Sequence, residues 1–185
     1  MKSHYRNFLR ERRDGLTQDE IIEKSQTMTD MLIESDLFKS CESLYAYLDV
    51  RNEVHTRPLI DYCLMAGKPV YVPVTHDKEM FFTRLFDFSN LKEAAFGIPE
   101  PENPVPAEPD SRSLFIIPGV GFDKHGNRIG YGAGFYDKYL SCRKYLHLVG
   151  ICFEIQLVDT LPADETDIQM DFILTEKRWI TGENR

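Results

Sequence analysis

The sequence has no long apolar run. No stretch approaches the roughly 20 apolar residues that a transmembrane helix needs, and residues 1–13 are charged throughout, without the apolar segment of a signal peptide. Glu11 and Asp14 also disfavour a mitochondrial presequence, because transit peptides are poor in acidic residues. We therefore expect a cytoplasmic protein that does not associate with a membrane.

Cysteines are also few, and basic residues are outnumbered by acidic ones. The four cysteines form no C-x-x-C pair, so their spacing fits neither a zinc site nor a disulfide framework. With 22 Lys and Arg against 30 Asp and Glu, the formal net charge is −8, which argues against a general nucleic-acid-binding protein. Cations are concentrated only at the N-terminus, where an anion could be bound locally. They are Lys2, Arg6, Arg10, Arg12 and Arg13.

The chain is long enough and apolar enough to form one folded domain. It has 185 residues, of which 42% are hydrophobic and 12% aromatic, and this composition rules out an intrinsically disordered chain. Because domains usually span about 100–200 residues, we expect a single domain over residues 1–185.

Two helices are predicted near the N-terminus. The first spans residues 2–13, and its apolar side carries Tyr5, Phe8 and Leu9. The second begins at Thr17, because the sequence Thr-Gln-Asp-Glu is a capping box in which the glutamate side chain reaches back to the helix start. Its buried face is predicted to consist of Ile21, Ser25, Met28 and Leu32.

Strand and helix signals alternate along the rest of the chain. Strands are predicted over residues 44–48, 70–74, 80–85, 114–117, 147–153 and 171–175. Helices are predicted to begin near residues 56–58 and to span residues 134–143, and the five prolines of residues 97–109 predict an extended loop. This alternation predicts an α/β fold, a three-layer open, mostly parallel sheet with helices on both faces. In such sheets ligands bind beyond the carboxyl ends of the strands.

The segment with the most chemical information is residues 118–140, PGVGFDKHGNRIGYGAGFYDKYL, which holds six of the eleven glycines. Glycine lets the backbone approach a ligand closely, and backbone N–H groups beside a helix N-terminus can bind an anion. Together with the charge of Arg128, this pattern favours phosphate binding. The alternative is a turn that only connects strand and helix. The segment matches neither the P-loop nor the dinucleotide fingerprint, so a nucleotide would be held by another geometry.

Four sequence elements, in order along the chain, carry a family resemblance. They are Lys2 with Arg6, Asn-Glu-Val-x-Thr at residues 52–56, Gly-Ile-Pro-Glu-Pro at residues 97–101, and the long, specific motif PGVGFDKHGNRIGYGAGFYD at residues 118–137. Together they resemble the 5-formyltetrahydrofolate cyclo-ligase family over nearly the whole chain. The resemblance implies a ligase that uses ATP and Mg²⁺ to close 5-formyltetrahydrofolate to 5,10-methenyltetrahydrofolate, with release of ADP and phosphate. The formyl oxygen would be phosphorylated before N10 attacks.

The resemblance also implies a set of site residues. Its ATP contacts fall on Lys2, Arg6, Arg128, Ile129, Gly130, Tyr131, Gly132, Ala133, Gly134, Phe135 and Tyr136. Its folate contacts fall on Leu48, Glu53, Tyr131, Gly132, Ala133, Gly134 and Phe135. Its Mg²⁺ carboxylates fall on Asp137 and Asp167, with Asp171 as an alternative to Asp167. Arg128 is the implied catalytic residue, since it would neutralise charge on the transferring phosphoryl group.

Each cation or acid of this set has a second interpretation. Lys2 and Arg6 lie four residues apart and can reach one ligand from a helix, or they can form a solvated basic face. Arg128 can instead brace the loop through an ion pair. Asp137 can simply favour a helix N-terminus, and Asp167 can be a solvated acid.

The folate contacts have alternatives as well. Glu53 could accept N–H groups of the pterin edge or cap a helix, and Leu48 could be ordinary core. Two positions depart from the family pattern: Phe135 stands where tyrosine is common, and Ala133 where glycine or lysine is common. Lys2 or Arg128 would then carry more of the charge that holds phosphate.

Some conspicuous residues are interpreted as lying outside the site. Arg10, Arg12 and Arg13 are predicted to be surface charges, and His125 a neutral surface histidine. Four phenylalanines could line a pterin slot, but core packing is favoured. They are Phe81, Phe82, Phe86 and Phe88.

Two other functions stay open at this point. One is a non-catalytic folate- or nucleotide-binding module, and the other is a sugar-phosphate isomerase or CoA-transferase-like enzyme, because fold alone does not fix function. In every case we expect small-molecule partners, no nucleic acid or membrane, and a monomer.

Overall fold

The chain alternates helices and strands, as its sequence predicts. The structure is a computed structural model that describes residues 1–94 and 97–183. Its helices are α1 Lys2–Asp14, α2 Gln18–Glu34, α3 Asp36–Ser40, α4 Arg57–Met65, α5 Phe135–Leu140 and the 3-10 helix η2 Glu154–Gln156. Its strands are β1 Ser43–Ala46, β2 Val70–His76, β3 Glu79–Leu85, β4 Leu91–Glu93, β5 Pro99–Pro101, β6 Pro106–Ala107, β7 Ser113–Ile117, β8 Gly121–Asp123, β9 Arg128–Ile129, β10 His147–Ile151, β11 Leu157–Val158, β12 Phe172–Leu174 and β13 Trp179–Thr181.

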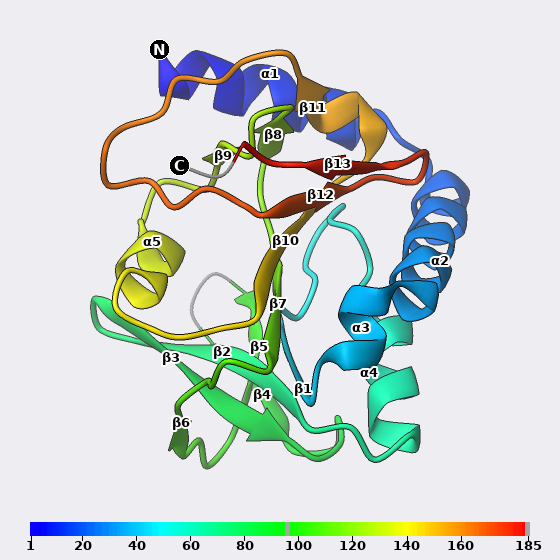
Figure 1. Cartoon of the computed structure of the whole chain (residues 1–185), viewed down its shortest axis with the longest axis vertical. Coiled ribbons are helices and arrows are strands. Elements are labelled where there is room, and N and C mark those ends of the chain that lie inside the picture. The colour runs from blue at the N-terminus through cyan, green and yellow to red at the C-terminus, as the bar shows by residue number, and fades with distance from the viewer. Residues whose placement is uncertain (95–96, 184–185) are drawn as a thin grey trace.

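One large sheet organises the molecule (Figure 1). Its eight strands run in the order β13-β12-β10-β7-β1-β2-β3-β6. The neighbours from β12 to β2 pair in parallel, whereas β13, β3 and β6 are antiparallel at the two edges. The predicted open, mostly parallel sheet is therefore confirmed.

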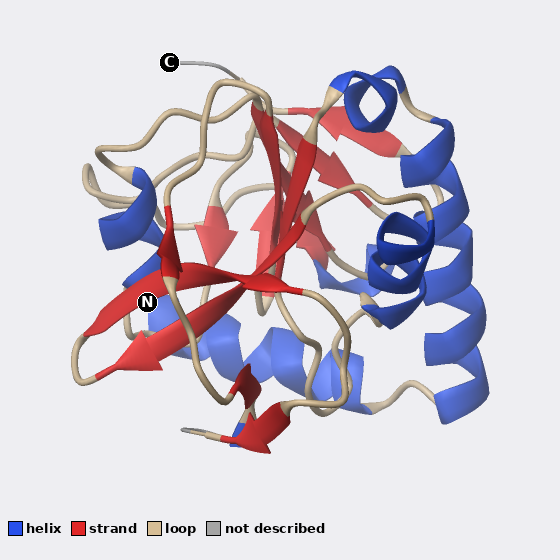
Figure 2. Ribbon diagram, turned by 90° about the horizontal axis from the view of Figure 1, so that it is seen from below, coloured by secondary structure: helices blue, strands red, loops and turns tan. Residues whose placement is uncertain are grey.

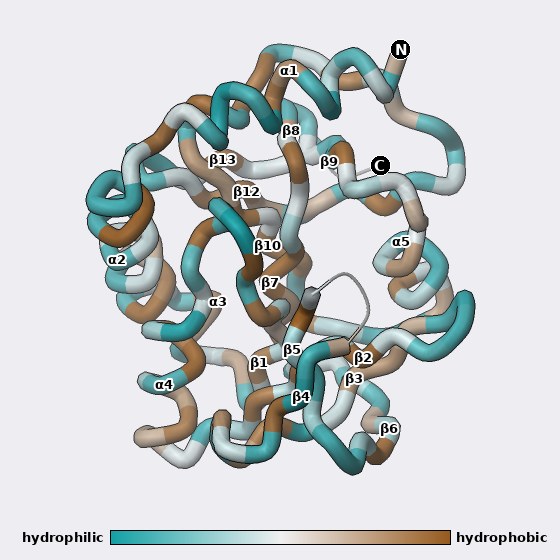
Figure 3. The backbone as a smooth tube through the Cα atoms, turned by 180° about the vertical axis from the view of Figure 1, so that it is seen from behind, coloured by the Kyte–Doolittle hydropathy of each residue, from teal (hydrophilic) through white to brown (hydrophobic). Residues whose placement is uncertain are grey.

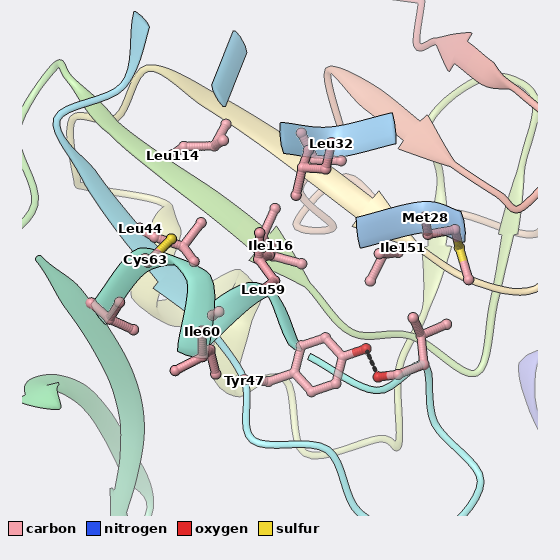
Figure 4. Packing of buried hydrophobic residues seen from close by; sticks show 14 of the residues in the cluster. Met28, Leu32, Leu44, Tyr47, Leu59, Ile60, Cys63, Leu114, Ile116 and Ile151 are labelled. Carbon is pink, nitrogen blue, oxygen red and sulfur yellow. Dashed lines mark hydrogen bonds between the residues drawn. The ribbon is translucent and has the colours of Figure 1, made fainter. Parts of the chain in front are cut away.

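Helices cover both faces of the sheet, as expected for a three-layer α/β fold. Figure 2 shows α2, α3 and α4 together on one side of the strands. The capping box of α2 is present, because Thr17 accepts the Glu20 N–H and the Glu20 side chain accepts the Thr17 N–H. Met28 and Leu32 of this helix are fully buried against the sheet (Figure 4). Burial of each such side chain stabilises the fold by about 1.5–3 kcal/mol.

The opposite face is covered by α5 over a cluster of aromatic rings. Tyr45 stacks on Phe115 with ring centroids 4.5 Å apart, and Phe82 lies 5.1 Å from the ring of Tyr139 in α5. In Figure 3 the central strands β7 and β10 carry hydrophobic colours, which fits strands buried on both faces. The core thus continues through the sheet.

A smaller sheet, β11-β8-β9, is formed within and after the glycine-rich segment. Helix α1 lies against it (Figure 1), and a separate buried cluster joins them: Leu9, Val120, Ile129 and Leu161. The apolar side predicted for α1 is right for Leu9 but wrong for Phe8, whose side chain is exposed beneath the Arg12 guanidinium. By this packing α1 is held against the loop that follows β9.

The proline-rich segment differs from the prediction. Instead of an unpaired loop it forms β5, which pairs with β4, and β6, which pairs with β3. Both are edge strands, where a proline that cannot donate a hydrogen bond is tolerated. None of the helices in the described part of the chain has both the length and the apolar character that a bilayer span requires.

Candidate active site

A pocket of about 570 Å³ lies beyond the carboxyl ends of β1 and β7. Tyr47 and Leu48 follow β1, Pro118 follows β7, and α1, the loop after β9 and the start of α5 complete the walls. This is the position and the size expected for a small-molecule site in an open α/β sheet. All implied site residues line this pocket: Lys2, Arg6, Leu48, Glu53, Arg128, Ile129, Gly130, Tyr131, Gly132, Ala133, Gly134, Phe135, Tyr136, Asp137 and Asp167.

The loop of residues 130–134 is fastened to α1 by Arg6. Its Nε donates a hydrogen bond to the carbonyl of Gly130 at 2.7 Å. Gly132 has φ +107°, and a side chain there would begin 3.7 Å from the Arg6 guanidinium. Arg6 therefore packs directly against the backbone of Gly132. This contact holds a cation within reach of any ligand that the loop binds.

Arg128 and Asp137 form an ion pair at the inner end of the pocket. Nη2 of Arg128 donates to both carboxylate oxygens of Asp137, each at 3.0 Å, and Nη1 donates to the Pro118 carbonyl at 3.3 Å. The Arg128 side chain is only 7% exposed, and its guanidinium lies over the ring of Tyr136. The loop-bracing ion pair that the sequence left open is thus present, in a position that also faces the pocket.

Lys2 bridges two acids from the loop before β12. Its Nζ lies 2.7 Å from Asp164 and 2.5 Å from Asp167. Burial alone would lower the pKa of Lys2, but the two carboxylates outweigh it and raise the pKa. Burial likewise opposes ionisation of Asp167, yet the Asp164 N–H and Lys2 lower its pKa. The alternative that these two residues are simply solvated charges does not hold, because each side chain is about three-quarters buried, at 26% and 24% exposure.

The residues present fit a Mg²⁺ ion that also binds phosphate. Ile168 donates its backbone N–H to Asp137 at 3.1 Å, so the neighbouring Asp167 is brought to the same wall of the pocket. Two carboxylates with room for phosphate oxygens and water are the donor set that Mg²⁺ prefers. Within the described residues, no group of three or more His, Cys, Asp or Glu side chains is placed to hold a metal without such a ligand.

Glu53 also lines the pocket and is only 6% exposed. One carboxylate oxygen accepts the Val50 N–H at 3.0 Å, and the other accepts the hydroxyl of Tyr131, which in turn accepts a hydrogen bond from Arg13 at 2.9 Å. Burial raises the pKa of Glu53, while Tyr131, Val50 and Arg13 act in the opposite direction. Leu48 is buried beside it at the pocket wall, so it is both core and lining.

The sequence missed several residues that the pocket brings together. Arg10 lines it and Arg13 lies just behind Glu53 at 2% exposure, so the surface positions predicted for both are wrong. The signal was available, because residues 2, 6, 10 and 13 fall within about 80° on a helix of 3.6 residues per turn. Glu100 of β5 is also buried at the pocket, where it accepts the Thr75 N–H at 2.8 Å.

The remaining candidates lie outside the pocket walls. Asp171 accepts the Leu148 N–H at 2.8 Å and does not line the pocket, so Asp167 has the better position. His125 is also absent from the walls. None of the four phenylalanines is among the described pocket residues: Phe82 is core, Phe88 packs beneath the Arg57 guanidinium, and Phe86 is 73% exposed, where core packing was predicted.

Fold and pocket together define an α/β protein with a small-molecule pocket, lined by several charged side chains, at the carboxyl ends of its central strands. A sequence profile of the 5-formyltetrahydrofolate cyclo-ligase family matches residues 1–176, and the chain belongs to this family of ligases. The motifs quoted from its sequence predict the same family, so that prediction is confirmed.

Individual relatives align with this chain over nearly their full length. The 5-formyltetrahydrofolate cyclo-ligase of Escherichia coli is 32% identical over 178 residues, which cover 92% of this chain and 98% of the relative. The solved structure of 5,10-methenyltetrahydrofolate synthetase from Aquifex aeolicus has a TM-score of 0.87 and 30% identity, covering 100% of this chain and 94% of the other. That of the enzyme from Mycoplasma pneumoniae has a TM-score of 0.75 and 26% identity, covering 95% of this chain and 98% of the other.

Proposed function

We propose that this chain catalyses the ATP- and Mg²⁺-dependent closure of 5-formyltetrahydrofolate to 5,10-methenyltetrahydrofolate, with release of ADP and phosphate. Family membership supports the reaction. The observation that carries it is that every residue implied for ATP, folate and Mg²⁺ lines one pocket. Residues 1–185 would act as one domain on small molecules only, and the cytoplasmic location and monomeric state expected from the sequence stay predictions.

The nucleotide would lie between α1 and the loop of residues 130–134. Lys2 and Arg6 face this space from α1, and Arg128 faces it from β9. Backbone N–H groups of a glycine-rich loop can bind phosphate oxygens without help from side chains. This explains why Ala133 and Phe135 can depart from the family pattern while the loop keeps its role.

Asp137 and Asp167 would hold Mg²⁺ on the same wall. When bound, the ion would neutralise phosphate charge and fix the orientation of the polyphosphate. Their present partners, Arg128 and Lys2, are cations that could then turn to the phosphates themselves.

The folate would occupy the side of the pocket lined by Leu48 and Glu53. A carboxylate has about four lone-pair sites, and Glu53 uses one on Val50 and one on Tyr131. Two sites remain to accept the adjacent N–H groups of a pterin ring, and Leu48 offers it an apolar surface.

The chemistry requires positioning and charge more than a side-chain nucleophile. The formamide oxygen of the substrate is a poor leaving group, so the γ-phosphoryl group of ATP is first transferred to it, giving an iminium phosphate and ADP. N10 then attacks the formyl carbon and loses its proton, and departure of phosphate leaves the methenyl bridge. Arg128 would stabilise the charge on the transferring phosphoryl group, and holding both substrates in one pocket makes the transfer effectively intramolecular.

The near-ultraviolet absorbance of the methenyl product tests the proposal. Folded protein mixed with 5-formyltetrahydrofolate and MgATP should give a rise that requires all three components. Absence of a rise would refute the cyclisation. Tight binding of folate without product would then favour a non-catalytic module, and turnover of a phosphosugar or acyl-CoA without ATP or Mg²⁺ would favour the isomerase or transferase alternative.

A further inference from the structure

Arg13 is a buried cation to which none of the proposed contacts with ATP, folate or Mg²⁺ gives a role. It lies in the last turn of α1, and its side chain is 2% exposed. Among the described residues, the nearest carboxylate is that of Asp14, 4.0 Å from Nε, and Nε makes no hydrogen bond. A charge removed from water is costly unless it is paired, so a structural role on the helix alone does not account for its burial.

The hydrogen bond that Arg13 does make leads to the pocket. Nη1 donates to the hydroxyl of Tyr131 at 2.9 Å, and that hydroxyl donates its only proton to Glu53. Because the tyrosine oxygen accepts from a cation, its proton becomes a better donor, and such chains of hydrogen bonds strengthen one another. The positive charge of Arg13 thus acts on the carboxylate of Glu53 through one intervening hydroxyl.

The arrangement also fixes where the carboxylate points. Val50 holds one oxygen and Tyr131 the other, while Arg13 lies on the inner side of Glu53, away from the main pocket. Three segments far apart in the chain therefore meet at this one group. The remaining lone pairs of Glu53 are presented to the pocket in a single orientation.

We propose that Arg13 and Tyr131 are positioning residues that orient Glu53 for recognition of the N–H edge of a reduced folate. This inference deepens the proposed function and rests on it. Arg13 touches no substrate and acts only through Tyr131. The phenolic hydroxyl of Tyr131 belongs to this folate-side network, even though its backbone lies in the loop proposed to bind ATP.

A double-mutant cycle on folate affinity tests the proposal. Dissociation constants for 5-formyltetrahydrofolate and for ATP are measured by calorimetry in wild type, Arg13→Met, Tyr131→Phe, Glu53→Gln and the combinations of Glu53→Gln with each of the other two. Arg12→Met, the exposed neighbour of Arg13 on α1, and Tyr62→Phe, whose ring is as exposed as that of Tyr131, are the matched controls. Thermal melting of each variant reports whether it folds.

The proposal predicts that the variants lose affinity for folate but not for ATP. Arg13→Met and Tyr131→Phe should each weaken folate binding roughly tenfold, as loss of a hydrogen bond to a charged group does. Affinity for ATP should stay within about twofold, and in the Glu53→Gln background both effects should fall below about twofold, because the group they act on is gone.

Two results would overturn it. One is folate affinity unchanged in a folded Tyr131→Phe protein, which serves as the test even where Arg13→Met fails to fold. The other is an equal loss in the presence and absence of Glu53, which would indicate a general structural effect. Wild-type turnover is recorded in parallel, so failure of the cyclisation itself is distinguishable: wild type would then bind folate without forming product.

Discussion

Arg128 and Asp137, nine residues apart, form an ion pair with both hydrogen bonds at 3.0 Å. Lys2 and Asp167 form a second pair 2.5 Å apart on the same wall of the pocket. Each pair joins a cation proposed for phosphate to a carboxylate proposed for Mg²⁺. In the proposed function, the two carboxylates would hold Mg²⁺ and the two cations would bind phosphate oxygens. The ion pairs would keep these side chains in place before the substrate arrives.

Replacement of Arg128 by alanine should reduce kcat about 10²–10³-fold, as removal of a group that stabilises transition-state charge does. It should also lower Tm by a few degrees, because Asp137 loses its partner in a nearly buried position. Steady-state kinetics and thermal melting measure the two effects. Arg112→Ala, which removes an exposed arginine paired with Glu42, is the control and should change neither. Wild-type kinetics in Arg128→Ala would refute its assigned role.

Asp167→Asn should raise the Mg²⁺ concentration needed for half-maximal rate at least about tenfold, and Asp137→Asn should do the same, because each removes a charged oxygen ligand. Asp164→Asn is the matched control, since Asp164 also pairs with Lys2 but is 74% exposed and is assigned no metal. A magnesium titration of the rate separates them. Equal effects at all three positions would mean that net charge, and not metal binding, is what these acids supply.

Local rules of sequence were sufficient for most of the fold. The capping box at Thr17 and the helical spacing of Ile21, Met28 and Leu32 depend on residues within a few positions of one another, and α2 forms as predicted. Strand positions and the mostly parallel sheet follow from apolar runs that alternate with helices. The short sheet β11-β8-β9 was not predicted, because its strands of two or three residues carry no periodicity.

Glu53 makes stability depend on pH in a predictable direction. Burial raises its pKa above the usual 4.5, so the folded state binds this proton more tightly than the unfolded state does. Its contribution to the free energy of unfolding therefore falls as pH rises from about 4.5 through the raised pKa.

Urea denaturation of wild type and Glu53→Gln at a series of pH values should reveal this. The variant lacks the titrating group, so its stability relative to wild type should increase from pH 4 to pH 7.5, by about 1.4 kcal/mol for each pKa unit. Altered hydrogen bonding to Tyr131 and Val50 in the variant adds an offset that does not vary with pH. The exposed Glu11→Gln serves as control. A difference between Glu53→Gln and wild type that stays constant with pH would contradict the burial effect.

Gly126 should tolerate alanine poorly. Its φ is +94°, and a Cβ there would lie 2.6 Å from the Met170 carbonyl oxygen. Gly67 is the matched control. Its φ of +73° is also positive, but no atom lies within 4 Å of the position that a Cβ would occupy. Gly67→Ala should cost about 1–2 kcal/mol, and Gly126→Ala about 1–3 kcal/mol more. Chemical denaturation measures both, and equal losses would show that the Met170 contact relaxes.

Site residues could be predicted from the sequence only where they belong to a recognisable motif. Lys2 and Arg6 share a helix face and both line the pocket, as that spacing predicts, while their shared ligand stays a prediction. The partners of these groups lie far away in sequence: Arg13 meets Tyr131 across 118 positions, and Lys2 meets Asp164 across 162. Helical spacing indicates that Arg13 shares a face with Lys2 and Arg6, but no local pattern shows which distant side chain each of them will meet.

The fate of the formyl oxygen tests the mechanism most directly. If 5-formyltetrahydrofolate labelled with ¹⁸O in its formyl group is converted in the presence of MgATP, the oxygen that accepts the γ-phosphoryl group should leave with it. Mass spectrometry should then find one ¹⁸O atom in each inorganic phosphate released. Unlabelled phosphate, with the label in water instead, would contradict phosphorylation of the formyl oxygen in this pocket.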